Sequence, residues 1–185
     1  MATRITRTLV VPVALWFAVS ESFAQSSRPE IAGHWEGTMV REGSVLAVSF
    51  DFSMLNGRLT GTFNADALRA LGIPLSAVEA LAPKVSFTLV GDTSQIVFGG
   101  EVDGGGALRG TFRDGVARGT FLLRKSNVEL PRYRSEEVRI ENGSVVLAGT
   151  VFTPLSGGRH PAVIFNHGSG VEGRFASRFF ADRMA

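Results

Sequence analysis

A short pattern that occurs three times limits the possible folds of this chain more than any other feature. Each copy reads glycine, three variable residues, then Gly-Thr-Phe, and the copies begin at Gly57, Gly106 and Gly115. The first glycine suits a turn, the second eases a sharp bend or a bulge, and the phenylalanine can enter a core. The repeat therefore predicts short antiparallel strands joined by tight turns.

The other features of residues 30–126 favour a β-rich domain. Val48, Phe50 and Phe52 alternate with polar residues, which is the period of a half-buried strand. Asn56-Gly57 is a strong hairpin signal because both residues tolerate a positive φ. Further strands are expected at 58–63, 85–90, 95–98 and 120–124. The pattern predicts a small antiparallel β-barrel or sandwich of about seven strands, closed by curling on itself.

Residues 65–81 are the exception within this domain. They are rich in alanine and carry leucine and valine at helical spacing, so they predict two helical turns at most, separated at Pro74.

The aromatic residues of the β-rich domain allow two interpretations. Trp35 and the phenylalanines could line a cavity that binds a ligand, or they could simply fill the core. We favour the core, because His34 is the only histidine in this domain and no convergent set of charged or metal-binding residues accompanies it.

The N-terminus predicts export. Residues 1–24 have the pattern of a signal peptide: Arg4 and Arg7, an apolar run at 9–19, and small residues before Gln25. The run is well short of the ~20 residues that span a bilayer. An uncleaved anchor is the alternative. We expect a secreted or periplasmic protein with no stable membrane anchor after cleavage, and a linker at 25–29. The absence of cysteine excludes a disulfide framework.

After a linker at 127–135, the pattern changes in residues 136–185. Two strands, 136–140 and 145–152, flank a second hairpin signal at Asn142-Gly143. A short apolar run at 162–165 predicts a third strand, buried on both faces. A glycine-rich turn follows at 166–170, and apolar residues from 174 onward share one face of an amphipathic helix.

Two segments of this region carry a family resemblance. They are EEVRIENGSVVLAGTVFTP from Glu136 and HPAVIFNHGSG from His160. They resemble the opening of an α/β-hydrolase, and more narrowly that of secreted esterases and acyl-peptidase-like serine hydrolases with a small β-rich domain in front. The resemblance implies a mixed fold, in which the β-rich domain is followed by the incomplete start of an α/β-hydrolase fold: hairpin, third strand, oxyanion loop and first helix.

The resemblance also implies site residues. The backbone N–H of Ser169, between Gly168 and Gly170, would form one arm of an oxyanion hole, and His167 would position the loop. The substrate of the full enzyme would be a small ester or an acylated molecule. Val171 departs from the family, in which proline often follows H-G-S-G.

The catalytic triad itself is not found in the chain. No serine has glycine two residues before and two after, as a nucleophile elbow requires, since Ser169 lies between His167 and Val171. We therefore expect an inactive N-terminal fragment of a hydrolase. Three scattered histidines argue against a metal site, no cofactor is expected, and a net charge of +2 without a basic cluster argues against nucleic acid. The oligomeric state stays open.

Two alternatives belong to other classes of protein. Gly168, Gly170 and Gly173 match the G-x-G-x-x-G of a dinucleotide-binding turn. Asn166 and His167 separate the first glycine from the strand, a hairpin precedes that strand, and export removes the chain from the nucleotide pool, so this alternative is weaker. The second alternative is an exported β-barrel module that binds a ligand.

Overall fold

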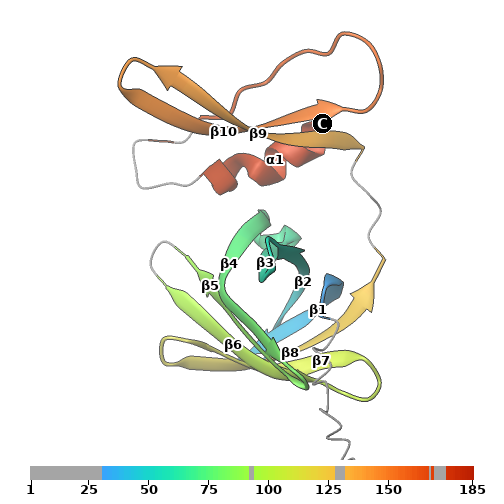
Figure 1. Ribbon diagram of the computed structural model, residues 1–185. Helices are drawn as coiled ribbons and strands as arrows, with labels where there is room; N and C mark the ends of the chain where they lie inside the picture. Colours follow the sequence, from blue (N-terminus) through green and yellow to red (C-terminus); the bar gives the residue numbers. More distant parts are fainter. Residues whose placement is uncertain (1–30, 92–93, 128–131, 167, 169–173) are drawn as a thin grey trace, which may run out of the picture.

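The N-terminal part of the protein is a closed antiparallel barrel. The computed structural model describes residues 31–91, 94–127, 132–166, 168 and 174–185. Within them, eight strands pair in sequence order and β1 pairs with β8 to close the ring (Figure 1). The strands are β1 (Gly33–Arg41), β2 (Ser44–Leu55), β3 (Arg58–Ala65), β4 (Ala70–Leu81), β5 (Lys84–Val90), β6 (Gln95–Val102), β7 (Ala107–Asp114) and β8 (Ala117–Ser126).

Aromatic side chains fill the interior of the barrel. Alternate residues of each strand point inward, and the buried set includes Trp35 and seven phenylalanines: Phe50, Phe52, Phe63, Phe87, Phe98, Phe112 and Phe121. The rings of Phe87 and Phe98 are stacked with their centroids 4.7 Å apart. Trp35 satisfies its indole N–H by donating to the carbonyl of Ile31 at 2.7 Å. These residues pack against one another as the core of the barrel, as expected of the favoured interpretation.

The repeated pattern contributes one buried phenylalanine per copy: Phe63, Phe112 and Phe121. The second glycine of each copy points inward beside a neighbouring strand. A Cβ at Gly110 would overlap the carbonyl oxygen of Gly99, and one at Gly119 would overlap the ring of Phe112. These glycines therefore leave room for rings and backbone in a narrow barrel.

The helical turns predicted for 65–81 are wrong. After a single 3₁₀ turn, η1 (Asp66–Leu68), the chain forms strand β4. Its inward residues Ile73 and Leu75 are followed by Val78 and Ala80, so the alternation shifts by one residue. The shift falls at Ala77, where φ is 48° and the pairing with β5 is irregular. Because of this bulge, the sequence of β4 does not show the uninterrupted alternation of inward and outward residues by which a strand is predicted.

The C-terminal region contains a two-stranded sheet and little helix. Strands β9 (Tyr133–Asn142) and β10 (Val145–Pro154) pair across the turn Gly143-Ser144, which confirms the hairpin predicted at this place. A 3₁₀ turn, η2 (Arg174–Ser177), leads into the short helix α1 (Arg178–Met184). Figure 1 shows α1 between the hairpin and the barrel.

The predicted fold class is wrong. The described residues form an eight-stranded closed barrel and a small two-stranded sheet, not a barrel or sandwich of about seven strands followed by the start of an α/β-hydrolase fold. Residues 162–165 form no strand, and the side chain of Ile164 is 81 % exposed. A strand requires a neighbour for its backbone N–H and C=O groups, and no described strand pairs with this segment.

Polar contacts hold α1 against the elements on either side. Arg183 forms an ion pair with Asp66 of η1 at 2.7 Å. On the other side, the hydroxyl of Tyr133 donates to Asp182, and the guanidinium of Arg178 lies 5.5 Å from the centre of the Phe152 ring. No residue of α1 is buried, so these contacts replace an apolar interface among the described residues.

Candidate functional site

Most of the residues predicted from the oxyanion-loop resemblance lie outside the described residues. His167, Ser169 and Gly170 belong to this group, and Gly173 of the alternative dinucleotide-binding turn also lies outside the described residues. Gly168 is described, and it is exposed and outside regular secondary structure. The assignment of Gly168, Ser169 and Gly170 as an oxyanion loop positioned by His167 therefore stays a prediction.

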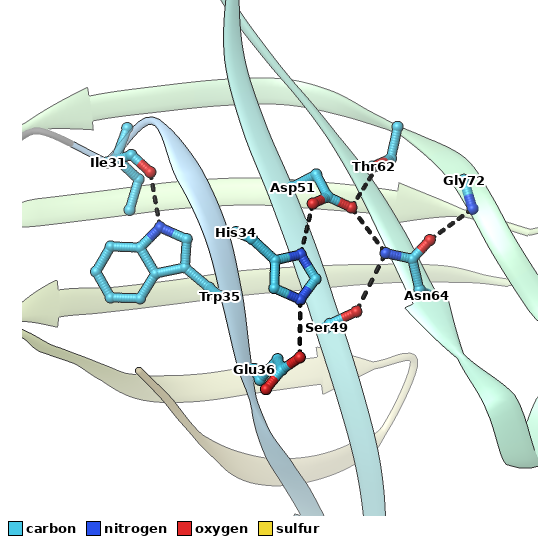
Figure 2. Close-up of polar contacts among 9 residues, drawn as sticks. All are labelled: Ile31, His34, Trp35, Glu36, Ser49, Asp51, Thr62, Asn64 and Gly72. Carbon is cyan, nitrogen blue, oxygen red and sulfur yellow. Dashed lines mark hydrogen bonds and ion pairs between the residues drawn. The ribbon is translucent and has the colours of Figure 1, made fainter. Parts of the chain in front are cut away.

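The most connected group of polar side chains in the described residues lies elsewhere, on the outer face of β1, β2 and β3 (Figure 2). It centres on His34, whose side chain is only 12 % exposed. Cross-strand register places His34 opposite Asp51, and Asp51 opposite Thr62. One step along the same face, Glu36 lies opposite Ser49, and Ser49 lies opposite Asn64. All six side chains point outward because the residues between them, such as Trp35, Phe50 and Phe63, point into the core.

The imidazole of His34 bridges two carboxyl groups. Its Nδ1 lies 2.6 Å from Oδ1 of Asp51, and its Nε2 lies 3.1 Å from Oε1 of Glu36. An ionised carboxylate only accepts hydrogen bonds. Both contacts are therefore satisfied when the ring carries a proton on each nitrogen, or when one of the two carboxyl groups is protonated.

Asn64 extends the network to the fourth strand. Its amide nitrogen donates to Oδ2 of Asp51 at 2.9 Å and to the hydroxyl of Ser49 at 3.2 Å. Its amide oxygen accepts the backbone N–H of Gly72 at 2.7 Å. Gly72 has a φ of 65° and falls where the pairing of β3 and β4 is irregular. The side chain of Asn64 thus supplies a hydrogen bond that the interrupted ladder does not.

The geometry of this network does not match an acyl-transfer site built on the His34–Asp51 pair. A histidine that activates a serine must have one ring nitrogen within reach of the hydroxyl. The second nitrogen of His34 faces Glu36 instead, and the contact of Ser49 is to Asn64. The arrangement joins four strands of the barrel and fixes their register.

Sequence reasoning missed this cluster. The alternation of residues assigns all six side chains to one face, and Asn56-Gly57 fixes the register of β2 on β3. The register of β1 on β2 has no equivalent signal, because the turn between them is Glu42-Gly43. Without that register, His34 is a lone histidine in a strand.

Among the described residues, Asp103 and Tyr133 have shifted pKa values, and both lie outside the network. Hydrogen bonding to the backbone N–H of Ala107, together with Arg109, holds the pKa of Asp103 below its ordinary value. Burial, with the hydrogen bond to Asp182, raises the pKa of Tyr133 to about 12. Asp103 caps the turn between β6 and β7, and Tyr133 joins the hairpin to α1, so both shifts have structural causes.

Within the described residues, no group of three histidine, cysteine, aspartate or glutamate side chains is arranged to hold a metal ion. No helix in that part of the chain is long and apolar enough to cross a membrane. Comparison with protein-family models, with curated proteins and with solved structures gives no match.

Proposed function

We propose that this chain is part of an exported serine hydrolase that acts on carboxylic esters or acylated peptides. In this proposal the barrel is an accessory domain, and residues 132–185 pack against the part of the enzyme that carries the catalytic triad. The resemblance of the segments from Glu136 and His160 suggests the class of enzyme. It rests on sequence alone.

The observation that carries the proposal is the lack of a core in residues 132–185. None of the described residues in this range is buried. Eleven large apolar side chains are exposed: Ile140, Val145, Val146, Leu147, Val151, Leu155, Val163, Ile164, Phe165, Phe180 and Met184. Apolar surface that gathers in one region is typical of an interface. The region therefore suits a segment that is completed by other residues.

The first test is the coding sequence that follows codon 185. The proposal expects an open frame that continues and encodes a G-x-S-x-G motif followed by an acid and a histidine, in the chain order of the family. A stop codon, or a continuing frame without such a motif, would overturn it. Residues 1–185 alone are expected to leave short-chain nitrophenyl esters unhydrolysed, because no nucleophile elbow is present in them.

The second test uses the complete hydrolase and addresses Ser169. If its backbone N–H stabilises the oxyanion, Ser169→Pro removes the donor and lowers kcat by about 10²–10³-fold. Ser169→Ala keeps the N–H and serves as the matched control, with kcat near that of the unmodified enzyme. A loss of activity in Ser169→Ala as large as in Ser169→Pro would assign the role to the hydroxyl and contradict the proposed one.

A further inference from the structure

Two adjoining grooves cross the outer face of strands β4 to β8. Each has a volume of about 750 Å³, and they share Ser86, Gly99 and Thr111. These shared residues alternate along their strands with the buried residues Phe87, Phe98 and Phe112, so they face away from the core. The grooves form one continuous depression, within the size range of ligand sites.

Small polar residues form the floor of this depression. Cross-strand register places Ser86 opposite Gly99, Gly99 opposite Thr111, and Thr111 opposite Thr120. The hydroxyls of Thr111 and Thr120 form no side-chain hydrogen bond with the described residues. The floor thus offers free hydroxyl groups on β7 and β8, with Gly99 of β6 and Ser86 of β5 beside them.

The fold does not require the glycine in the middle of this floor. A Cβ at Gly99 would meet nothing within 4 Å, and this residue does not have a positive φ. The next residue contrasts with it, because a Cβ at Gly100 would overlap the carbonyl oxygen of Arg109. Gly100 is needed for packing, whereas the effect of Gly99 is to keep the groove open.

Two arginines with no acidic partner stand at one wall of the groove. Arg113 of β7 and Arg118 of β8 are directly opposite each other, and both are exposed. Like charges in this position repel each other, and neither arginine forms an ion pair with a described residue. At the other end of the groove, Lys84, Glu101 and Arg109 alternate in sign across the strands. Positive side chains without an acidic one beside them in the register are therefore found at the wall formed by Arg113 and Arg118.

The geometry points to a binding site for an acidic oligosaccharide on this face, with a sugar carboxylate held between Arg113 and Arg118. Guanidinium groups bind carboxylates with paired hydrogen bonds. The hydroxyls and backbone of the floor suit the hydroxyl groups of the neighbouring sugars. The buried rings of Phe98 and Phe112 point away from the groove and offer no stacking surface for a nucleic-acid base. Glu79, Glu101 and Asp103 at the far end disfavour a ligand that carries a negative charge on every unit.

Calorimetric titration with a hyaluronan hexasaccharide tests the site, because its carboxylates alternate with neutral sugars. The proposal expects saturable binding that weakens as salt is added. The double variant Arg113→Gln/Arg118→Gln is expected to weaken binding about tenfold or more, which is the scale of losing charge-assisted hydrogen bonds. Gly99→Val is expected to weaken it similarly by filling the groove, with Gly99→Ala intermediate.

Matched controls separate this site from general charge and folding effects. Arg58→Gln/Arg124→Gln removes the same net charge at other positions of the barrel. Gly157→Val adds the same side chain as Gly99→Val, but outside the barrel. Both control variants are expected to bind the hexasaccharide as the unmodified protein does. Circular dichroism should give the same melting temperature for the variants as for the unmodified protein. Absence of binding, equal binding by the Gly99→Val variant, or binding of inorganic pyrophosphate but not of the hexasaccharide would each overturn the proposal. Equal binding of neutral maltohexaose would also overturn it, since the arginine pair would then be irrelevant.

Discussion

The barrel and the C-terminal region obtain their structure in different ways. Among the described residues, seventeen apolar residues are buried, and all lie between Ile31 and Leu123. They come from every strand of the barrel except β4, together with Ile31 just before β1. The hairpin and α1 contribute none, although both contain apolar side chains at regular spacing. Regular apolar patterning is thus present in both regions, but only the barrel buries its own apolar side chains.

The contrast shows why closure matters. In the barrel, β1 and β8 pair and leave no open sheet edge. In the hairpin, β9 and β10 pair only with each other, so each has a second edge without a strand partner among the described residues. A lone two-stranded hairpin is marginally stable in water. The stability of the C-terminal region should therefore depend more on the contacts of the hairpin with α1 and of α1 with the barrel than on its own apolar pattern.

The largest expected effect is in the barrel core. Phe98 is fully buried and packs against Phe50, Phe87, Phe112 and Phe121. Phe98→Ala should lower the free energy of unfolding by about 3–5 kcal/mol, because it leaves a cavity among these rings. Urea unfolding followed by circular dichroism measures it, and Phe98→Leu provides a milder variant if the alanine variant does not fold.

The matched substitution in the other region is Phe165→Ala. This side chain is 38 % exposed in a segment without strand pairing, and its loss should change stability by less than about 0.5 kcal/mol. Hydrogen exchange adds a residue-level measurement, with slow exchange expected in strands β1 to β8 and faster exchange in β9, β10 and α1. Equal protection in the two regions, or equal costs for the two alanine variants, would remove the distinction between them.

Local signals predicted much of the barrel. The alternation around Phe50 and Phe52 and the turn at Asn56-Gly57 depend only on nearby residues, so the sequence is sufficient to place them. The bulge at Ala77 is not local in this sense, because it depends on how β4 pairs with its two neighbours. The same applies to His34, whose contacts depend on register between β1 and β2.

The C-terminal region shows the limit of a local pattern. Residues 162–165 are apolar and partly β-branched, and this composition predicts a buried strand wherever it occurs. A strand forms only when its backbone finds partners, and the partner is a property of the whole structure. The resemblance supplied an expected partner sheet, but the described residues do not contain one.

An intermediate effect is expected at the polar network on the barrel. Asn64→Ala removes the acceptor for Gly72 N–H and the donor to Asp51 and Ser49. Because the network is partly buried, the free energy of unfolding of this variant should be about 1–2 kcal/mol lower in the same urea experiment. Ser53→Ala is the control, since its hydroxyl contact with Thr60 is exposed and its loss should cost little. An Asn64→Ala variant as stable as the control would show that the barrel ladder suffices without the network.

The smallest expected effect tests the contact between the hairpin and α1 by pH. The chain contains one tyrosine, so ultraviolet absorbance during an alkaline titration reports on Tyr133 alone. Burial and the hydrogen bond to Asp182 place its pKa at about 12, above the ordinary value of 10.0. The folded state therefore holds the phenol proton more tightly than the unfolded state. Its contribution to stability is complete below the unfolded pKa and is lost as the pH rises through the folded one.

Asp182→Asn separates the two causes of this shift. The substitution keeps a hydrogen-bond acceptor but removes the negative charge, so the pKa of Tyr133 should fall while burial holds it above the ordinary value. The same titration in denaturant gives the unfolded reference. A pKa in the native protein equal to that reference would mean that Tyr133 does not pack against α1 in solution. In that case the hairpin would lack its contact with the helix. The difference in stability between the barrel and the C-terminal region would then be larger than their burial alone indicates.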